Sequence, residues 1–405
     1  MSIQKKLNPH FIGIGGIGVS ALAKYYKSKG HKISGSDIAL KGHAARNIPK
    51  ETDLVVYSPA VKPDNPEIKE AKRRKIKLQS YPQALGELTK QYFTIAVAGT
   101  HGKSTTTAMI GLILTKAGLD PTVIVGTKVK EFGNSNCRTG KSAYLVIEAC
   151  EHEASFLNYS PNIIVITNIE AEHLDYFKSF GNVLRAFKKF TAKLPENGVL
   201  IDSKKYKKTK DAAKLRKILK IPGEHNVENG LAALAAARAL KIPDKISFQA
   251  LAEFQGTWRR FEERNLKIGS CQLKIVSDYG HHPTEIRATL QAAKEKWPKK
   301  KIWCVFQPHQ YQRTHYLFND FIEALEKAPV DKLIITDIFD VAGRESKKLK
   351  EKVSSEKLVK AINNAKTIYL SKDKIIGCLK KDLRDGEVVI FMGAGDIYQI
   401  DKKFH

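Results

Sequence analysis

The sequence predicts an α/β protein of three domains, and three observations carry this prediction. Short apolar runs alternate with helix-like patterns along most of the chain, which is typical of parallel sheets covered by helices. A chain of 405 residues is too long for one ordinary core and suits two or three domains. Two glycine-rich loops, each between a strand-like run and a helix-like run, indicate two phosphate-binding units. We expect domains at residues 1–88, 89–257 and 258–405.

The composition is that of a globular protein, which we expect in the cytoplasm. Hydrophobic residues make up 42% of the chain and charged residues 27%, and no apolar run approaches the ~20 residues of a membrane helix. The N-terminal stretch passes directly from a short basic lead into a strand-like run, so we expect no secretory signal. Five scattered cysteines form no CxxC pair, which indicates neither a disulfide framework nor a zinc site.

The net charge of +27 favours polyanions in general without choosing among them. Lysine-rich stretches such as residues 69–77 lack the interleaved aromatic residues of a base-stacking surface. We interpret the lysines as a solvated surface and expect no nucleic-acid partner. The alternative is a basic ATPase that binds nucleic acid, which predicts salt-sensitive binding and nucleic-acid-stimulated hydrolysis.

The first domain is expected to contain a phosphate-binding glycine loop. Strand-like runs occupy residues 10–14, 32–34 and 54–58, and a helix is expected at 19–28. Between the first strand and this helix, the loop GIGGIG lets an anion approach backbone amides at the positive end of the helix.

The same loop leaves two alternatives open. Gly13, Gly15 and Gly18 match the GxGxxG pattern of dinucleotide-binding enzymes, and Asp37 follows the second strand. A nicotinamide-dependent oxidoreductase would explain this pattern but not the second glycine loop of the chain. A tight turn without a ligand is the other alternative.

The second domain contains the most informative stretch, GTHGKST at residues 99–105. It lies between a strand-like run at 93–98 and a helix expected to begin near Thr105. The Lys103 ammonium can reach the β- and γ-phosphates of a nucleotide, and the Ser104 hydroxyl can bind magnesium. The stretch departs from the pattern GxxxxGK[ST] because Val97 stands where the first glycine belongs.

Further polar residues follow the later strands of this domain, which are expected at residues 144–149 and 162–168, before a helix at 227–240. Glu148 ends one strand and His173 follows the other, at the sheet edge where α/β proteins place their ligands. The two side chains are candidates for a second magnesium ion, and the alternative is an ordinary structural role for each. The third domain is expected to contain strands at 273–278, 301–307, 332–337 and 387–395.

Nine motifs follow one another along the chain between Phe11 and Tyr398. They are HFIGIGGIG, AGTHGKSTT, EACEHEASFL, ITNIEAEHLDYF, PGEHNVENGLAA, WRRFE, SDYGHHPTEI, FQPHQYQRT and FMGAGDIY. In this order they resemble the Mur ligase family. The resemblance implies a Rossmann-like N-terminal domain for a UDP-linked sugar, a central domain like a P-loop ATPase for ATP, and a Rossmann-like C-terminal domain for an amino acid.

The resemblance implies an ATP- and Mg²⁺-dependent ligase of peptidoglycan precursor synthesis. Such an enzyme joins L-alanine to the carboxylate of UDP-N-acetylmuramate through an acyl phosphate. The sequences of the motifs SDYGHHPTEI, EACE and NIEAEHLDYF are closer to the alanine-adding branch of the family. The alternative is a ligase that recycles murein peptides. The expected partners are these substrates, without membrane insertion, and the expected state is a monomer or weak homodimer.

The resemblance also implies roles for single residues. The expected catalytic residues are Lys103, Glu148 and His173, and the expected magnesium ligands are Ser104, Glu148 and His173. ATP contacts are implied for Gly99, Thr100, His101, Gly102, Lys103, Ser104, Thr105, His225, Asn226, Asn229 and Arg260. UDP-sugar contacts are implied for Gly15, Gly16, Gly18, Asp37 and Ser58, and amino-acid contacts for His281 and Arg313. For His281 and His282, a capped turn before Pro283 is the alternative.

The chain departs from the family in three places, and the role of one lysine, Lys188, has to be considered separately. The stretches 37–54 and 201–221 are short for the family, and Gln310 stands where many members have arginine. Lys188 lies fifteen residues beyond His173, a spacing similar to that of the carbamylated lysine of other branches. Because residues 185–190 form an amphipathic pattern with adjacent lysines, we expect Lys188 to be solvated.

Overall fold

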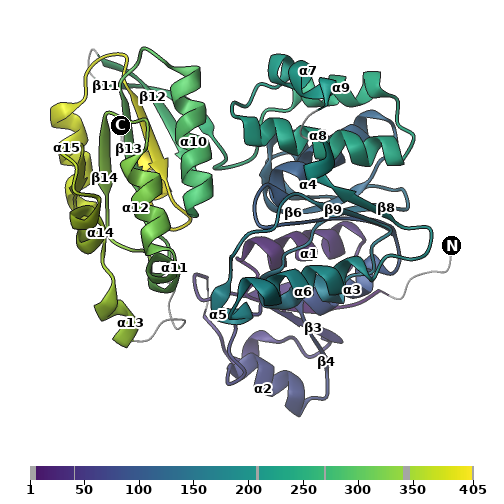
Figure 1. Cartoon of the computed structure of the whole chain (residues 1–405). Helices are drawn as coiled ribbons and strands as arrows, with labels where there is room; N and C mark the ends of the chain where they lie inside the picture. Colours follow the sequence, from purple (N-terminus) through teal and green to yellow (C-terminus); the bar gives the residue numbers. More distant parts are fainter. Residues whose placement is uncertain (1–5, 41, 207–208, 269–270, 341–346, 404–405) are drawn as a thin grey trace. The chain divides into compact units, whose positions relative to one another are not determined.

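The computed structural model of the chain describes residues 6–40, 42–206, 209–268, 271–340 and 347–403. It contains three sheets, one of four strands and two of six, with helices packed against them (Figure 1). The chain divides into two compact units, described separately below. Unit 1 comprises Met1–Lys220 with Val227–Thr257, and unit 2 comprises Ile221–Asn226 with Trp258–His405.

The first sheet of unit 1 is parallel, in the order β2-β1-β3-β4. Its side chains alternate between two cores, as the period of two requires. Phe11 and Val56 face a core with α1 and α3, whereas Ile12 and Val55 face a smaller core with α2. The elements are β1 (Pro9–Ile12), α1 (Ile17–Ser28), β2 (Ser34–Ser36), η1 (Ala45–Asn47), β3 (Leu54–Tyr57), α2 (Pro66–Arg73), β4 (Lys77–Ser80) and α3 (Tyr81–Thr89).

The second sheet has the order β10-β9-β5-β8-β6-β7, in which β7 runs antiparallel to β6. Its helices and strands are β5 (Phe93–Ala98), α4 (Lys103–Lys116), β6 (Thr122–Val129), β7 (Ser135–Arg138), β8 (Tyr144–Glu148), β9 (Ile163–Ile166), α5 (Leu174–Phe177), α6 (Phe180–Thr191), β10 (Val199–Asp202), α7 (Lys210–Ile218), α8 (Glu224–Ala239) and α9 (Asp244–Glu253). Three 3₁₀ helices accompany them: η2 (Lys130–Phe132), η3 (His152–Asn158) and η4 (Ser203–Tyr206).

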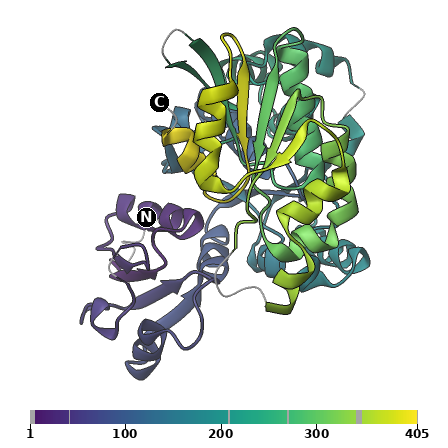
Figure 2. The ribbon, with the colours of Figure 1, turned by 90° about the vertical axis from the view of Figure 1, so that its left-hand side faces the viewer.

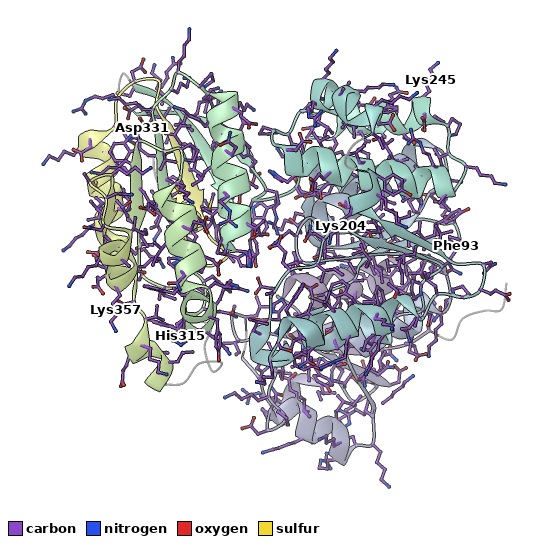
Figure 3. The ribbon with its side chains drawn as sticks, in the orientation of Figure 1. Phe93, Lys204, Lys245, His315, Asp331 and Lys357 are labelled. Atoms are coloured by element: carbon purple, nitrogen blue, oxygen red, sulfur yellow. The ribbon has the colours of Figure 1, made fainter. Side chains whose placement is uncertain are left out.

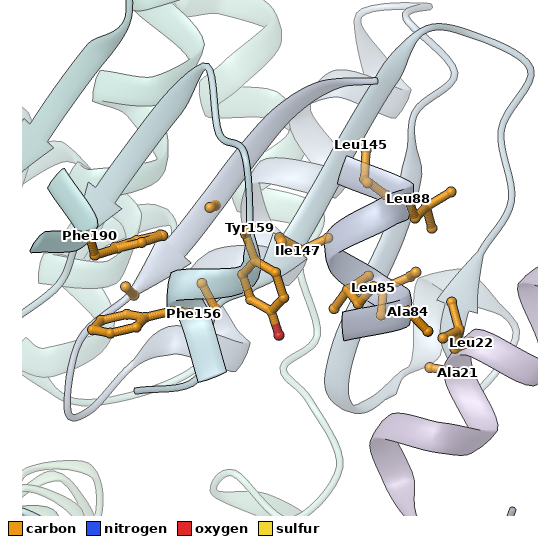
Figure 4. Close-up of a cluster of buried hydrophobic side chains, with 14 of the residues drawn as sticks. Ala21, Leu22, Ala84, Leu85, Leu88, Leu145, Ile147, Phe156, Tyr159 and Phe190 are labelled. Atoms are coloured by element: carbon orange, nitrogen blue, oxygen red, sulfur yellow. The ribbon is translucent and has the colours of Figure 1, made fainter. Parts of the chain in front are cut away.

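One hydrophobic core joins the two sheets of unit 1. Side chains of α1, α3 and α6 pack with those of both sheets in this core. Phe156 stacks on Phe190 with ring centroids 4.5 Å apart, and Tyr159 is 1% exposed nearby (Figure 4). Burying each side chain of this size contributes about 1.5–3 kcal/mol. The shared core explains why the first two sheets form one compact unit.

The sheet of unit 2 has the order β11-β12-β16-β13-β14-β15, with helices on both faces (Figure 2). Helices α10, α12 and α14 pack on one face, and α15 packs on the other. Its elements are β11 (Glu262–Ile268), β12 (Cys271–Asp278), α10 (Pro283–Lys296), β13 (Ile302–Phe306), α11 (Tyr311–Tyr316), α12 (Phe318–Glu326), β14 (Lys332–Ile335), α13 (Lys347–Lys352), α14 (Ser355–Ile362), β15 (Thr367–Tyr369), η5 (Lys372–Lys374), α15 (Ile375–Asp382), β16 (Val388–Met392) and α16 (Tyr398–Lys403).

The structure corrects several expected boundaries. The second strand lies at Ser34–Ser36, two residues later than expected, because the buried Ser36 side chain bonds to a carboxylate inside the domain. Helix α4 begins at Lys103 and not near Thr105, since Gly102 with φ 81° forms its N-cap. The lysine-rich stretch 69–77, for which no element bounds were predicted, contains most of α2 and the start of β4.

Two further expectations from composition concern the exposure of the lysines and the absence of membrane-spanning helices. Exposed lysines such as Lys245 and Lys357 project outward from the ribbon (Figure 3). Within the described ranges, no helix is both long and apolar enough to cross a membrane.

Candidate functional site

The central glycine loop follows β5 and ends in the N-terminus of α4. Its turn requires glycine at two positions. At Gly99, with φ 139°, a Cβ atom would lie 2.0 Å from the Thr167 hydroxyl, and at Gly102 it would lie 2.2 Å from the Asn229 side-chain oxygen. The turn ends at the N-terminus of α4, where the unpaired amides of a first helical turn and the helix dipole favour an anion.

The loop is held in place by the segment after β9. Thr167 donates its hydroxyl hydrogen to the His101 carbonyl at 2.6 Å, and the His101 amide donates to the Asn168 side chain at 2.9 Å. The Thr100 hydroxyl accepts from the amide of Glu170 at 2.8 Å. Neighbouring parallel strands therefore supply both the loop and its support, at the edge where open α/β sheets bind ligands.

Lys103 folds back over this loop and meets a buried carboxylate. Its Nζ donates to the Gly99 carbonyl at 2.6 Å and the Thr100 carbonyl at 3.0 Å, and it lies 3.0 Å from Glu151 Oε2. The Glu151 side chain is only 2% exposed. Burial by itself lowers the pKa of Lys103, but the Glu151 carboxylate, together with Cys150 and Glu148, outweighs burial and raises the pKa above its usual value. The loop thus contains an ammonium that stays charged.

Glu148 lies on the other side of the same helix start. Its Oε2 accepts a hydrogen bond from the Ser104 hydroxyl at 2.8 Å and one from the Gly126 amide at 2.8 Å. A Cβ atom at Gly126 would lie 2.7 Å from that oxygen, so β6 approaches closely enough to fix the carboxylate. A hydroxyl and a carboxylate oxygen at this separation suit Mg²⁺, which prefers hard oxygen ligands.

His173 precedes α5 in a left-handed conformation with φ 54°. Its Nε2 lies 3.8 Å from Glu151 Oε1, and its ring meets that of His152 edge to face at 4.5 Å. Burial raises the pKa of Glu151, while the Lys103 ammonium acts in the opposite direction. Glu151 therefore links the loop lysine to His173, and Glu148 links Ser104 to β6.

The remaining unit 1 residues expected at ATP also adjoin the loop. Asn229 reaches from α8 to the underside of the loop, where its side-chain oxygen accepts from the Thr106 hydroxyl at 3.2 Å. Thr105 is 5% exposed in the first turn of α4. In this position Asn229 supports the phosphate loop itself.

The residues expected at the UDP-sugar gather at the edge of the first sheet. The Gly15 amide donates to Asp37 Oδ2 at 3.0 Å, and a Cβ atom at Gly15 would lie 2.9 Å from that oxygen. Gly16 is the N-cap of α1, and Ser58 lies against Gly13. Gly18 has a packing role, because its missing Cβ lets α1 approach the Tyr81 ring.

In unit 2, His225 and Arg260 lie in one electrostatic environment. Burial, followed by the neighbouring Arg260 guanidinium, lowers the pKa of His225 to about 4. Arg260 pairs with Glu285 at 3.2 Å, and Asn226 donates to the Pro222 carbonyl at 2.7 Å. The imidazole of His225 is therefore neutral at pH 7, as a group that contacts a nucleotide base would be.

Glu285 also organises the turn before α10. The His281 amide donates to Glu285 Oε2 at 3.0 Å, and His282 is the N-cap of a capping box completed by Glu285. The capped turn, considered as an alternative, is therefore present. The His281 ring nevertheless faces the His309 ring, with centroids 5.8 Å apart.

Arg313 lies at the same edge of this sheet. Its guanidinium donates to the His309 carbonyl at 3.0 Å and lies 3.0 Å from His309 Nδ1. His309 in turn stacks on Phe339 at 5.4 Å. The ends of β12 and β13 thus bring together His281 and Arg313, the two residues expected to bind an amino acid. Gln310, with φ 70°, caps α11 beside them.

Sequence reasoning missed Glu151 and Glu285, which pair with Lys103 and Arg260. Each carried a signal: Glu151 is the second carboxylate of EACE, and Glu285 stands at the third position of a helix opened by proline. Lys188 is exposed on α6, as expected of a solvated side chain.

Three family models match the chain in the order of its sheets. The model described as "Mur ligase family, catalytic domain" matches residues 8–93. The model described as "Mur ligase middle domain" matches residues 97–219, and "Mur ligase, glutamate ligase domain" matches residues 259–395. Together they account for most of the chain.

Individual relatives agree with these matches. The UDP-N-acetylmuramate–L-alanine ligase of Acetivibrio thermocellus is 38% identical over 455 aligned residues, covering 98% of this chain and 95% of the relative. That of Clostridium acetobutylicum is 39% identical over 461 residues, covering 99% and 98%. Because both alignments exceed 405 residues, these relatives contain segments that this chain lacks.

Solved structures share the architecture. The UDP-N-acetylmuramate–alanine ligase MurC of Thermotoga maritima superposes with a TM-score of 0.79 at 27% identity, covering 98% of both chains. A murein peptide ligase of Psychrobacter arcticus reaches a TM-score of 0.69 at 23% identity, again over 98% of both chains, and shares the fold.

Proposed function

The chain belongs to the Mur ligase family, and from this premise we propose that it is the ATP-dependent ligase that joins L-alanine to the carboxylate of UDP-N-acetylmuramate. The observation that carries the chemistry is the charged Lys103 inside a glycine loop whose next residue, Ser104, is bonded to Glu148. That arrangement suits transfer of a phosphoryl group. The reaction serves peptidoglycan precursor synthesis, and the proposed location of the enzyme is the cytoplasm.

Phosphorylation solves the chemical difficulty of the reaction. A carboxylate is a poor electrophile, and hydroxide is a poor leaving group. An oxygen of the muramyl carboxylate attacks the γ-phosphorus of ATP, ADP leaves, and an acyl phosphate forms. The alanine amine then attacks the acyl carbon and loses a proton. The bond between this carbon and the phosphate-bearing oxygen breaks, and inorganic phosphate leaves with the former carboxylate oxygen.

Residues of this chain stabilise the first step through charge and position. The Lys103 ammonium would neutralise the negative charge that develops on the phosphoryl oxygens, and the N-terminus of α4, which begins at Lys103, would favour the same anion through its dipole. When bound, Mg²⁺ would neutralise further charge, with Ser104 as a ligand of one ion and Glu148 and His173 as ligands of a second. Asn229 and the segment after β9 fix the loop in position.

The two other substrates are assigned to the other sheet edges. We propose that Gly15, Gly16, Asp37 and Ser58 bind the UDP-sugar, with Gly18 acting through packing, and that His281 and Arg313 bind alanine. Arg313 is suited to a carboxylate because its planar guanidinium donates two parallel hydrogen bonds. His225, Asn226 and Arg260 are proposed to contact ATP. The proposed domain limits are 1–88 for the UDP-sugar domain, 89–257 for the ATP domain and 258–405 for the amino-acid domain.

The direct test is phosphate release with each substrate omitted in turn. Release from ATP is expected only with UDP-N-acetylmuramate and L-alanine together, because the sugar's carboxylate is the phosphoryl acceptor. UDP-N-acetylglucosamine, which lacks the lactyl carboxylate, is the matched negative control. Robust hydrolysis with ATP alone, or stimulation by DNA, would contradict the proposal. Faster release with a murein tripeptide than with alanine would favour the recycling ligase.

Arg313→Ala is expected to raise the KM for L-alanine by at least about 10-fold, since a charge-assisted hydrogen bond contributes about 1.5–3 kcal/mol. The KM for ATP should stay within about twofold, because that substrate is assigned elsewhere. Steady-state kinetics with each substrate varied would measure the split. Arg287→Ala, which removes an exposed arginine of α10, is the control. Equal increases in both constants would remove Arg313 from the amino-acid site.

A further inference from the structure

A buried carboxylate lies behind the proposed UDP-sugar site of the first sheet. Glu67 stands in the first turn of α2, where its amide donates to the N-cap Asn65, and its side chain turns into the domain and is fully buried. Glu67 is not among the expected site residues, and the proposed reaction steps do not involve it. Burying a carboxylate is costly unless hydrogen bonds compensate it.

The compensation comes from the start of the sheet and from the loop after β2. His10 Nε2 lies 2.9 Å from Glu67 Oε2, and the Ser36 hydroxyl donates to the same oxygen at 2.6 Å. Oε1 accepts from the Asn47 side chain at 2.8 Å and from the Ala44 amide at 3.1 Å. His43 Nδ1 lies 3.3 Å from Oε1. One carboxylate thus binds both ends of the segment from Ser36 to Asn47.

These bonds are strong enough to keep the carboxylate ionised. Burial by itself raises the pKa of Glu67, but the hydrogen bonds from His10, Ser36 and Asn47 outweigh it and lower the pKa to about 2. Hydrogen bonds to an ionised acceptor are roughly twice as strong as neutral ones.

Backbone bonds also hold the start of this segment. Ser36 pairs with Ile12 of β1, and its carbonyl accepts from the amides of Gly13 and Ile14 in the glycine loop. The apolar residues Ile38 and Leu40 are 81% and 68% exposed, so hydrophobic burial does not anchor this part of the segment. The carboxylate of Asp37 accepts from the Gly15 amide of the glycine loop at 3.0 Å and from the Ala39 amide at 3.0 Å. The position of Asp37 against the glycine loop therefore depends on the backbone bonds of Ser36 together with the bonds that Glu67 makes on both sides of Asp37.

We propose that Glu67 is a positioning residue of the UDP-sugar site, which holds the segment from Ser36 to Asn47 and thereby sets Asp37 against the glycine loop. The proposal rests on the assignment of the UDP-sugar to this sheet edge.

The test compares Glu67→Gln with the parent enzyme. The amide keeps the size of the side chain but removes its charge and replaces one acceptor oxygen with a donor. The Kd for UDP-N-acetylmuramate by calorimetry and its KM are expected to rise by about 10-fold, equivalent to about 1.4 kcal/mol. The kcat at saturating sugar and the KM for alanine should remain within about twofold.

Hydrogen exchange provides a readout independent of activity. Peptides covering residues 36–48 should lose protection in Glu67→Gln, whereas peptides from α4 should not. Glu51→Gln is the matched control, because that carboxylate is about half exposed and pairs with Lys32 at the surface. If Glu67→Gln does not fold, Asn47→Ala removes one donor to Oε1 and leaves the carboxylate in place, and it should raise the same Kd severalfold.

The outcomes separate this proposal from the proposed function. A parent enzyme that does not bind UDP-N-acetylmuramate would contradict the function, while the exchange measurement would still report on the anchor. A parent that binds the sugar, with a folded Glu67→Gln variant of unchanged Kd and exchange, would overturn the positioning role. A fall in kcat without a change in sugar affinity would also overturn it.

Discussion

Lys103→Ala is expected to lower turnover by at least about 10²-fold, because it removes the ammonium that faces the charge developing on the transferred phosphoryl group. The structure adds a second expectation. The variant leaves Glu151 buried without its ion-pair partner, and breaking a buried pair costs about 3–5 kcal/mol of stability. Steady-state kinetics and thermal denaturation would measure the two effects.

A double variant separates catalysis from folding. Lys103→Ala with Glu151→Gln removes the unpaired charge, so most of the lost stability should return while turnover stays low. Lys90→Ala, at an exposed lysine that pairs with Glu87, is the control and should change neither quantity. Recovery of turnover in the folded double variant would show that Lys103 supports only the structure of the loop.

Glu148→Gln is expected to lower kcat/KM for MgATP by about 10²-fold, since metal coordination contributes several kcal/mol to phosphoryl transfer. The amide keeps the shape of the side chain and can still accept from Ser104 or Gly126, so the loop should keep its conformation. The lost negative charge should weaken binding of the cation. Titrating Mg²⁺ at fixed ATP should show a higher concentration for half-maximal turnover.

Glu153→Gln is the matched control for this effect. It lies in the same motif, but its side chain is exposed, so its substitution should leave the Mg²⁺ dependence unchanged. A Glu148→Gln enzyme with the parent's Mg²⁺ dependence would remove Glu148 from the metal site.

The local sequence pattern was sufficient to predict the strands that precede the glycine loops. Residues 93–98 are apolar and precede a loop rich in glycine, and they form β5 as expected. Alternation and glycine spacing are local properties, so they can be read without knowing the partners of a strand. The bounds of the lysine-rich α2 and the strand β4 were not predicted, because their few apolar residues are significant only once a core covers them.

The site shows the same division. Lys103 and Ser104 were identifiable because a phosphate loop is one continuous segment. Glu148 was expected at the same sheet edge, but its bond to Ser104 and the pairing of Glu151 with Lys103 were not identifiable, because both carboxylates reach the loop from the end of a neighbouring strand. The sequence alone carries no distance between segments, and only the register of parallel strands brings such side chains to one edge.

By itself the sequence determined the α/β class, the two glycine loops and the family, because these depend on composition, short-range pattern and the order of motifs. Only the tertiary structure decided what the buried carboxylates bind: Glu151 pairs with Lys103, Glu285 pairs with Arg260, and Glu67 accepts a hydrogen bond from Ser36 beside Asp37. The physical reason is that a buried charge is tolerated only beside partners that compensate it, and in a parallel sheet those partners come from distant parts of the chain.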